Sequence, residues 1–331
     1  MSKLHHAKSL AATFIAAWAL VACGGSNSTN DGSNTGNAGG SSGNTPSTGF
    51  SGQDASAPKL INNIATDGLN WINYRRSQVG MSTLTRNGRI DIAAQGHSDY
   101  QRINNIVSHE EVPGKQGYTG TILQDRLAAA SYVIQTPNAI GEVISATNNA
   151  SGFYMAEELI TAIYHRFVIF EPVFREIGTG AASTSASPAY NYFTADFATS
   201  GGYGAGLAAG TLATWPFNGQ TGVTRNFFSN LEEPDPVPDQ NEVGYPVSVH
   251  TNLTRVLTVQ SFTMRARGAT ANLNTRLLVQ GQDANMKNNR SAAAIVPLAP
   301  LAASTTYDIT FIGAIDGTQI SRTWSFTTAA Q

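Results

Sequence analysis

The stretch FVIFEPVFREIGTG, residues 167–180, combines three phenylalanines with a proline and a closing Gly-Thr-Gly. An exposed loop seldom carries so many large apolar side chains, and a central strand seldom contains a residue such as Pro172, which has no ladder donor. The tripeptide Tyr164-His165-Arg166 precedes the stretch directly. The second half of the stretch overlaps a strand that is predicted at 174–182.

Apolar residues at regular spacing surround this stretch. Helical spacing predicts helices at four ranges, namely 58–78, 88–104, 122–132 and 152–166. Alternation predicts a further strand at 190–199, and Gly80 is expected to end the first helix. The glycine-rich segment 201–210 lacks the Gly-Lys-Ser/Thr ending of a phosphate-binding loop, so we interpret it as an ordinary loop.

The last third of the chain consists of short runs with β-strand character. These runs follow residues 232–246, a proline-rich segment that we interpret as an interdomain linker. Asp316-Gly317 is a hairpin-turn signal between two of them. Several short strands joined by turns indicate a β-sandwich over 247–331. The run LAASTTYDITF resembles the penultimate strand of bacterial immunoglobulin-like domains, which implies that Tyr307 is the tyrosine of a corner motif.

The N-terminal residues have the pattern of an export signal. Residues 1–22 join a short basic start to an apolar run that is too short to span a membrane. The segment Leu20-Val21-Ala22-Cys23 resembles a bacterial lipobox, which implies cleavage before Cys23 and acylation of that residue; the alternative is an ordinary signal peptide with a chance cysteine. Residues 23–57, rich in Gly, Ser and Asn, are predicted to be a flexible tether. Gly24, in place of aspartate, favours the outer membrane or cell surface.

The composition excludes several classes of function. Only 13% of the residues are charged and the net charge is −2, so neither nucleic acid nor an anionic membrane surface is an expected partner. Contact with a membrane is expected only through a lipid at Cys23, which is the single cysteine. The chain contains no Gly-x-Ser-x-Gly, His-Glu-x-x-His or dinucleotide-binding fingerprint.

Five ordered motifs in the first half carry a family resemblance. They are LNWINYRRSQVGMSTLTRNGRIDIAAQGHSDY, IVSH, IGEV, YHR and FREIGTG. Together, over residues 60–200, they resemble the cysteine-rich secretory, antigen 5 and pathogenesis-related (CAP) superfamily in its disulfide-free bacterial branch. The resemblance implies an α+β chain: a CAP-like α-β-α sandwich with a C-terminal extension over 58–231, followed by an all-β immunoglobulin-like sandwich. It also implies that Phe167, Phe170 and Phe174 fill the core.

The family has a cleft that carries two histidines and two glutamates. The resemblance places His109, Glu142 and His165 in this cleft, although Val143 stands where asparagine is usual. The second glutamate has no direct match. Its expected place falls near Ala162, and Glu158, one helical turn earlier, is the candidate. Two imidazoles and a carboxylate could bind Zn²⁺ with one position open, or activate water without a metal.

Each of these residues also has a structural interpretation. His109 could cap a loop, His165 could sit at a helix end near the C-terminal dipole, and Glu142 could be a turn residue. His97, on the helix face with Ala93 and Tyr100, is more consistent with a hydrogen-bonded core histidine. His250 opens the predicted second domain and is interpreted as incidental.

Three functions remain open. The first is a surface-anchored lipoprotein whose CAP-like cleft binds a lipid, a peptide or a cell-wall fragment, with the immunoglobulin-like domain as spacer or adhesion module. The second is a hydrolase of envelope or extracellular substrates, with Glu142 as base and His109 and His165 holding a metal ion or an oxyanion. The third is a structural or adhesion component with a vestigial cleft. We expect binding rather than catalysis, because a cleft with one acid is poorly equipped for acid–base chemistry.

Overall fold

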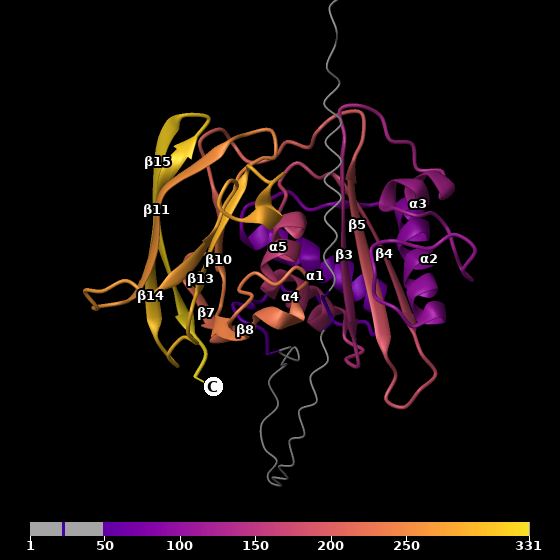
Figure 1. Ribbon diagram of the computed structural model, residues 1–331, viewed down its shortest axis with the longest axis horizontal. Helices are drawn as coiled ribbons and strands as arrows, with labels where there is room; N and C mark the ends of the chain where they lie inside the picture. The colour runs from indigo at the N-terminus through magenta and orange to yellow at the C-terminus, as the bar shows by residue number, and fades with distance from the viewer. Residues whose placement is uncertain (1–21, 24–48, 331) are drawn as a thin grey trace, which may run out of the picture.

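The computed structural model describes residues 22–23 and 49–330 (Figure 1). The predicted signal peptide and most of the predicted tether lie outside these residues, apart from Ala22, Cys23 and the segment from residue 49 onward. The described chain is mixed α+β, as predicted: an α-β-α unit is followed by an all-β sandwich. None of the described helices is long and apolar enough to cross a membrane.

A five-stranded sheet lies at the centre of the first unit. Its strand order is β1 (Ala22–Cys23), β3 (Ala139–Thr147), β5 (Asn191–Thr199), β4 (Glu176–Ser183) and β2 (Thr85–Arg86). The three central strands are antiparallel, whereas β1 and β2 pair in parallel at the edges. Figure 1 shows α2 (Gly88–Asn104) and α3 (Leu123–Ala129) on one face of this sheet. The other face carries α1 (Ile64–Gln78), α4 (Gly152–Thr161) and α5 (Ile163–Ile169).

Alternation along β3 assigns its side chains to the two faces of the sheet. A Cβ atom at Gly141 would meet Val168 of α5, and Ser145 donates a hydrogen bond to Glu158 of α4. Glu142, one residue after Gly141, instead meets Arg126 of α3. Because successive residues of a strand point to opposite faces, Glu142 faces the α2–α3 layer and not the layer that contains α5.

The ends of the helices follow their capping residues. Asn87 caps α2 by accepting the Arg89 N–H at 2.9 Å, and Asn105 ends it in the left-handed conformation, so the predicted bounds 88–104 are confirmed. The first helix begins later than predicted, because the Asn63 side chain accepts the Thr66 N–H and starts α1 at Ile64. The predicted helix 152–166 is two helices, since the backbone at Ala162 is extended and separates α4 from α5.

The glycines of the opening stretch serve close packing between a strand and a helix. A Cβ atom at Gly178 of β4 would lie 2.2 Å from the Asp91 nitrogen of α2, and one at Gly180 would lie 2.2 Å from the Gln95 nitrogen. The backbones of α2 and β4 therefore approach too closely for any side chain. Phe167, Phe170 and Phe174 are buried, as expected.

We expect Gly178→Ala to lower the free energy of unfolding by about 1–3 kcal/mol, because the new methyl group would push α2 away from the sheet. The matched control is Gly88→Ala at the first residue of α2, where a Cβ atom would meet nothing within 4 Å. This control should be neutral or stabilising by less than about 1 kcal/mol. Urea unfolding of both variants measures the difference, and equal effects would contradict the close-packing explanation.

The C-terminal part has the strand order of an immunoglobulin-like sandwich. One sheet has the order β12 (Thr275–Leu278), β13 (Ala292–Pro297), β10 (Val247–His250) and β6 (Ala213–Trp215). The other has the order β11 (Leu257–Ala266), β14 (Thr306–Ile315), β15 (Thr318–Thr328) and β7 (Gln220–Val223). The Tyr307 hydroxyl accepts the Ala302 N–H at 2.8 Å, which is the hydrogen bond of a tyrosine corner.

Two predicted boundaries differ from the structure. Strands β6 and β7 pair within the sandwich sheets, so residues 213–223 belong to the sandwich and not to the unit predicted over 58–231. The predicted linker 232–246 is packed: Glu232, Val237 and Tyr245 are buried, and β9 (Glu242–Gly244) pairs with β8 (Asn226–Phe228). Strands of three or four residues have too few alternations for a sequence pattern to reveal them.

The end of the predicted tether is also packed. Phe50 contacts Trp71 of α1 with ring centroids 5.0 Å apart, and the Gly52 N–H donates to the Thr221 carbonyl at 2.9 Å. Asp54 donates its backbone N–H to the Tyr74 hydroxyl at 3.0 Å. Residues 50–57 therefore connect α1 to β7, so the ordered chain begins before the predicted boundary at residue 58.

Helix α5 joins the two units into one body. It lies between the central sheet and the sandwich in Figure 1. Phe170 packs edge-on against Trp215 at 5.3 Å, and both Phe167 and Phe170 contact the ring of His250. Arg166 donates to the Pro246 carbonyl at 2.8 Å. His250 is therefore a residue of the junction, and burial lowers its pKa to about 3.

Candidate functional site

The first histidine of the predicted cleft is held by two charged neighbours. His109 Nδ1 and Glu142 Oε1 lie 2.8 Å apart, and Arg126 Nη2 donates to Glu142 Oε2 at 2.5 Å. Arg126 also donates to the His109 carbonyl at 2.8 Å. The side chains of His109 and Glu142 are only 8% and 4% exposed. The predicted pairing of His109 with Glu142 therefore exists, but both oxygens of Glu142 already have partners.

Charge keeps Glu142 ionised despite its burial. Burial opposes ionisation, but the positive charge of Arg126, followed by His97 and His109, outweighs it. The pKa of Glu142 is therefore well below its ordinary value.

A second buried acid, Asp196, lies directly opposite Glu142 on β5. It is fully buried, and neither of its carboxyl oxygens meets a hydrogen-bond donor within the described part of the chain. Burial, and then the charge of Glu142, raises the pKa of Asp196 well above its ordinary value. The negative charge of Glu142 thus disfavours a second negative charge on Asp196, and the positive charge of Arg126 opposes this shift. Asp196 was missed from the sequence, although an acid within the otherwise apolar run YFTADFA was a usable signal.

His97 anchors the loop that presents His109. Its Nδ1 lies 2.8 Å from Glu111 Oε1 and its Nε2 lies 2.7 Å from the Ser108 carbonyl. Both partners only accept hydrogen bonds, so the two contacts form together only when both ring nitrogens carry protons. Glu111 also accepts the Thr119 N–H at 2.6 Å, which closes the loop. The fully buried position of His97 confirms the core interpretation.

The second predicted histidine has a different acidic partner. His165 Nδ1 lies 3.1 Å from Glu232 Oε1, and both side chains are fully buried. The carboxylate of Glu232 also accepts the first three N–H groups of α5, from Ile163, Tyr164 and His165 at 2.8, 2.6 and 3.2 Å. Glu232 is therefore the carboxylate that pairs with His165. The sequence contained no signal for it, because 67 residues separate the pair.

Glu158, the candidate second acid, contacts no histidine among its described partners. It accepts a hydrogen bond from Ser145. Burial raises its pKa to about 7, although hydrogen bonds from Ser145 and Tyr154 oppose this shift.

The residues do not fit the predicted shared zinc ion. In the ranges 22–23 and 49–330, no three His, Cys, Asp or Glu residues are close enough together to hold a metal ion. The structure therefore does not bring His109, Glu142 and His165 together as predicted. The physical reason is that Glu142 faces the α2–α3 layer and is bound by Arg126, whereas His165 belongs to a helix on the opposite face and is bound by Glu232.

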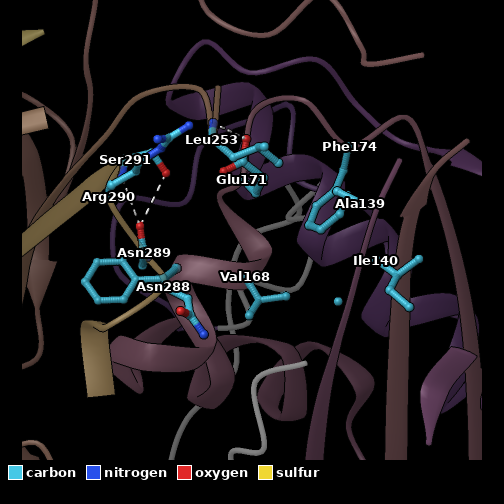
Figure 2. Close-up of a pocket in the computed structure, with 12 residues that line it drawn as sticks. Ala139, Ile140, Val168, Glu171, Phe174, Leu253, Asn288, Asn289, Arg290 and Ser291 are labelled. Carbon is cyan, nitrogen blue, oxygen red and sulfur yellow. Dashed lines mark hydrogen bonds between the residues drawn. The ribbon is translucent and has the colours of Figure 1, made fainter. Parts of the chain in front are cut away.

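A pocket opens where the two units meet (Figure 2). Ala139, Ile140 and Phe174 line one side, and residues 288–291 of the sandwich line the other, with Val168 between them. Its empty space is about 660 Å³ with the open mouth included. The Leu253 N–H donates to Glu171 at 3.1 Å on the rim, and burial raises the pKa of Glu171 to about 7. The pocket thus has an apolar floor and a rim of amide, guanidinium and carboxyl groups.

These observations define an α-β-α unit fused to an immunoglobulin-like sandwich, with one buried histidine–carboxylate pair, His165–Glu232, at the junction and another, His109–Glu142, in the α2–α3 layer. Residues 69–197 match the family model described as CAP, the cysteine-rich secretory protein family, so the chain carries a CAP domain.

Several solved structures resemble the chain, among them the following two proteins. One is an extracellular protein containing an SCP domain from Bacillus anthracis str. Ames, at 24% identity, with 41% of this chain and 40% of that chain covered and a TM-score of 0.35. The other is an outer surface protein of Borrelia burgdorferi, at 11% identity, with 40% of this chain and 89% of that chain covered and a TM-score of 0.33. The chain thus spans less than half of the Bacillus protein. No curated protein matches it.

Proposed function

We propose that the chain is an exported lipoprotein whose CAP and immunoglobulin-like domains together bind an acyl chain of a cell-envelope molecule. The observation that carries the proposal is the junction pocket of Figure 2. Both domains supply its walls, and α5 holds them in a fixed arrangement. Ligand sites commonly occupy such concave, mostly apolar clefts between domains.

The walls of the pocket favour an acyl chain over a peptide or a sugar. Ala139, Val168 and Phe174 offer apolar surface on one side, while the hydrogen-bonding groups of Glu171 and of residues 288–291 lie toward the sandwich. A peptide or glycan fragment would bury amides or hydroxyls against the apolar floor without partners, which is unfavourable. An acyl chain can fill the floor while its polar head contacts Asn288 and Arg290 at the rim.

Binding is a better explanation than hydrolysis for this arrangement. Glu142, the base of the hydrolase alternative, uses one oxygen for His109 and the other for Arg126. With its pKa far below the ordinary value, it is a weak base. The alternative of a purely structural component predicts that the junction pocket binds nothing.

A titration with dodecanoate tests the proposal. The mature chain carrying Cys23→Ser, which has no lipid of its own at that position, should bind dodecanoate saturably in calorimetry. Asn288→Trp, at the exposed rim, should fill the pocket and weaken binding at least tenfold. Lys287→Trp, the exposed neighbour outside the lining, should leave it unchanged. Absence of saturable binding, or equal effects of the two tryptophans, would reject the acyl-binding site.

The lipid anchor has a separate test. The lipobox at residues 20–23 supports acylation of Cys23, and several acyl chains on one residue anchor a protein durably. The wild-type protein should enter the detergent phase on partitioning, and Cys23→Ser should be soluble in the aqueous phase or remain unprocessed. Equal partitioning of the two would contradict the anchor.

A further inference from the structure

We propose that a second pocket, between α4 and residues 224–231, binds a primary alkylammonium group. Its empty space is about 1040 Å³ with the open mouth included. Four aromatic side chains and two carboxylates contribute to its lining: Phe50, Tyr154, Phe227, Phe228, Glu157 and Glu158. None of the described residues that line it is Lys, Arg or His. Aromatic walls around an acid, without a basic side chain, are complementary to a small organic cation.

The first of the two acids already has its counterion. Arg75 donates to both oxygens of Glu157, at 2.8 and 3.0 Å, and the Trp71 indole N–H donates at 2.7 Å. The guanidinium of Arg75 is fully buried behind this contact and also lies 4.7 Å from the centroid of the Trp71 ring. Glu157 is therefore a neutralised part of the wall, and its charge is not available to a ligand.

Within residues 22–23 and 49–330, the second acid has only neutral partners. Ser145 donates to Glu158, and the hydroxyl of Tyr154 lies near it, but neither group carries a positive charge. The residue as a whole is half-buried, because part of it faces the pocket, while the carboxyl group is desolvated enough to raise its pKa to about 7. A desolvated carboxylate without a cation is unfavourable, and an ammonium ion in the pocket would supply the missing charge.

The aromatic walls favour a cation with an alkyl stem. Phe227 is 7% exposed and forms part of the interior, whereas Phe228 is 41% exposed at the pocket. Phe50 is held in place by its contact with Trp71 at 5.0 Å. Ring faces attract a nearby ammonium group and also cover methylene groups. A primary ammonium matches better than a quaternary one, because its N–H groups can donate to Glu158.

Ligand-observed NMR on the mature chain tests this site with butylammonium and its uncharged isostere, 1-butanol. Butylammonium should bind at least tenfold more tightly than 1-butanol at pH 8. Glu158→Gln should remove this preference, because the amide keeps the shape and loses the charge. Nα-acetyl-lysine-N-methylamide, added in parallel, distinguishes a free amine from a lysine side chain of a protein as the source of the ammonium group.

Two aromatic substitutions provide a matched comparison. Phe228→Ala should weaken butylammonium binding at least threefold, whereas Tyr118→Ala, at a ring that is 39% exposed but outside the pocket, should not change it. Equal affinities of wild type for butylammonium and 1-butanol would overturn the proposal. Unchanged butylammonium binding in Glu158→Gln would also overturn the proposal, because the folded variant would then bind the cation without the Glu158 carboxylate.

Discussion

Replacing Glu232 with alanine should lower the free energy of unfolding by about 3–5 kcal/mol, a larger loss than is expected for Gly178→Ala. Glu232 is buried, accepts three backbone N–H groups of α5 and contacts His165 Nδ1 at 3.1 Å. Removing the carboxylate leaves these buried donors without an acceptor, and each unsatisfied donor costs about 1–3 kcal/mol. Urea unfolding followed by tryptophan fluorescence measures the loss.

Two further variants make the result interpretable. Glu232→Gln keeps the shape and one acceptor oxygen, so it should lose less stability than Glu232→Ala. Asp239→Ala removes an exposed acid from the same segment and should change the free energy of unfolding by less than about 0.5 kcal/mol. If Glu232→Ala behaved like Asp239→Ala, residues 232–246 would be the loose linker that the sequence predicted, and the two domains would not form one body through α5.

Replacing Glu158 with glutamine should stabilise the protein at pH 8 by about 2–3 kcal/mol and have little effect near pH 4.5. The folded-state pKa of Glu158 is about 7, above the ordinary value of 4.5, because burial disfavours the charged form. The folded state therefore binds the proton more tightly than the unfolded chain. The stabilising contribution of the protonated group is present in full below about pH 4.5 and is lost as the pH rises through 7.

The expected stabilisation follows from the raised pKa of Glu158, since each pKa unit corresponds to about 1.4 kcal/mol. Partial access of water from the pocket reduces this free energy. Urea midpoints of wild type and Glu158→Gln at pH 5 and pH 8.5 measure the difference. Glu110→Gln, at an exposed glutamate, should show the same small difference at both pH values. A pH-independent difference for Glu158→Gln would mean that the carboxyl group is well solvated in the folded protein.

The two consequences of Glu158→Gln separate stability from binding. The variant should be more stable than wild type at pH 8 and yet lose its preference for butylammonium. A loss of binding could not then be attributed to unfolding. A buried carboxyl group that lowers stability is expected where activity requires it, because functional sites commonly trade stability for a ligand contact.

The sequence by itself determined most of the secondary structure and the presence of the first histidine–carboxylate pair. The helix at 88–104 and the strand at 318–328 follow from local periodicity and turn residues, which act within a few positions of the chain. The pairing of His109 with Glu142 followed from family motifs that stand 33 residues apart. The hydrogen bond of Tyr307 followed from a motif contained within one strand and its preceding turn.

Only the tertiary structure decided which charges meet. Arg126, Asp196 and Glu232 complete the two histidine sites, and none of them belongs to a motif that the sequence revealed. Their roles depend on which face of the sheet each side chain takes and on which distant segment covers α5. The short strands β6 and β7 became part of the sandwich for the same reason, because pairing with distant strands stabilises them and local pattern does not. The charge of Arg126 then lowers the pKa of Glu142, whereas burial raises the pKa of Asp196, a difference that residue type alone cannot specify.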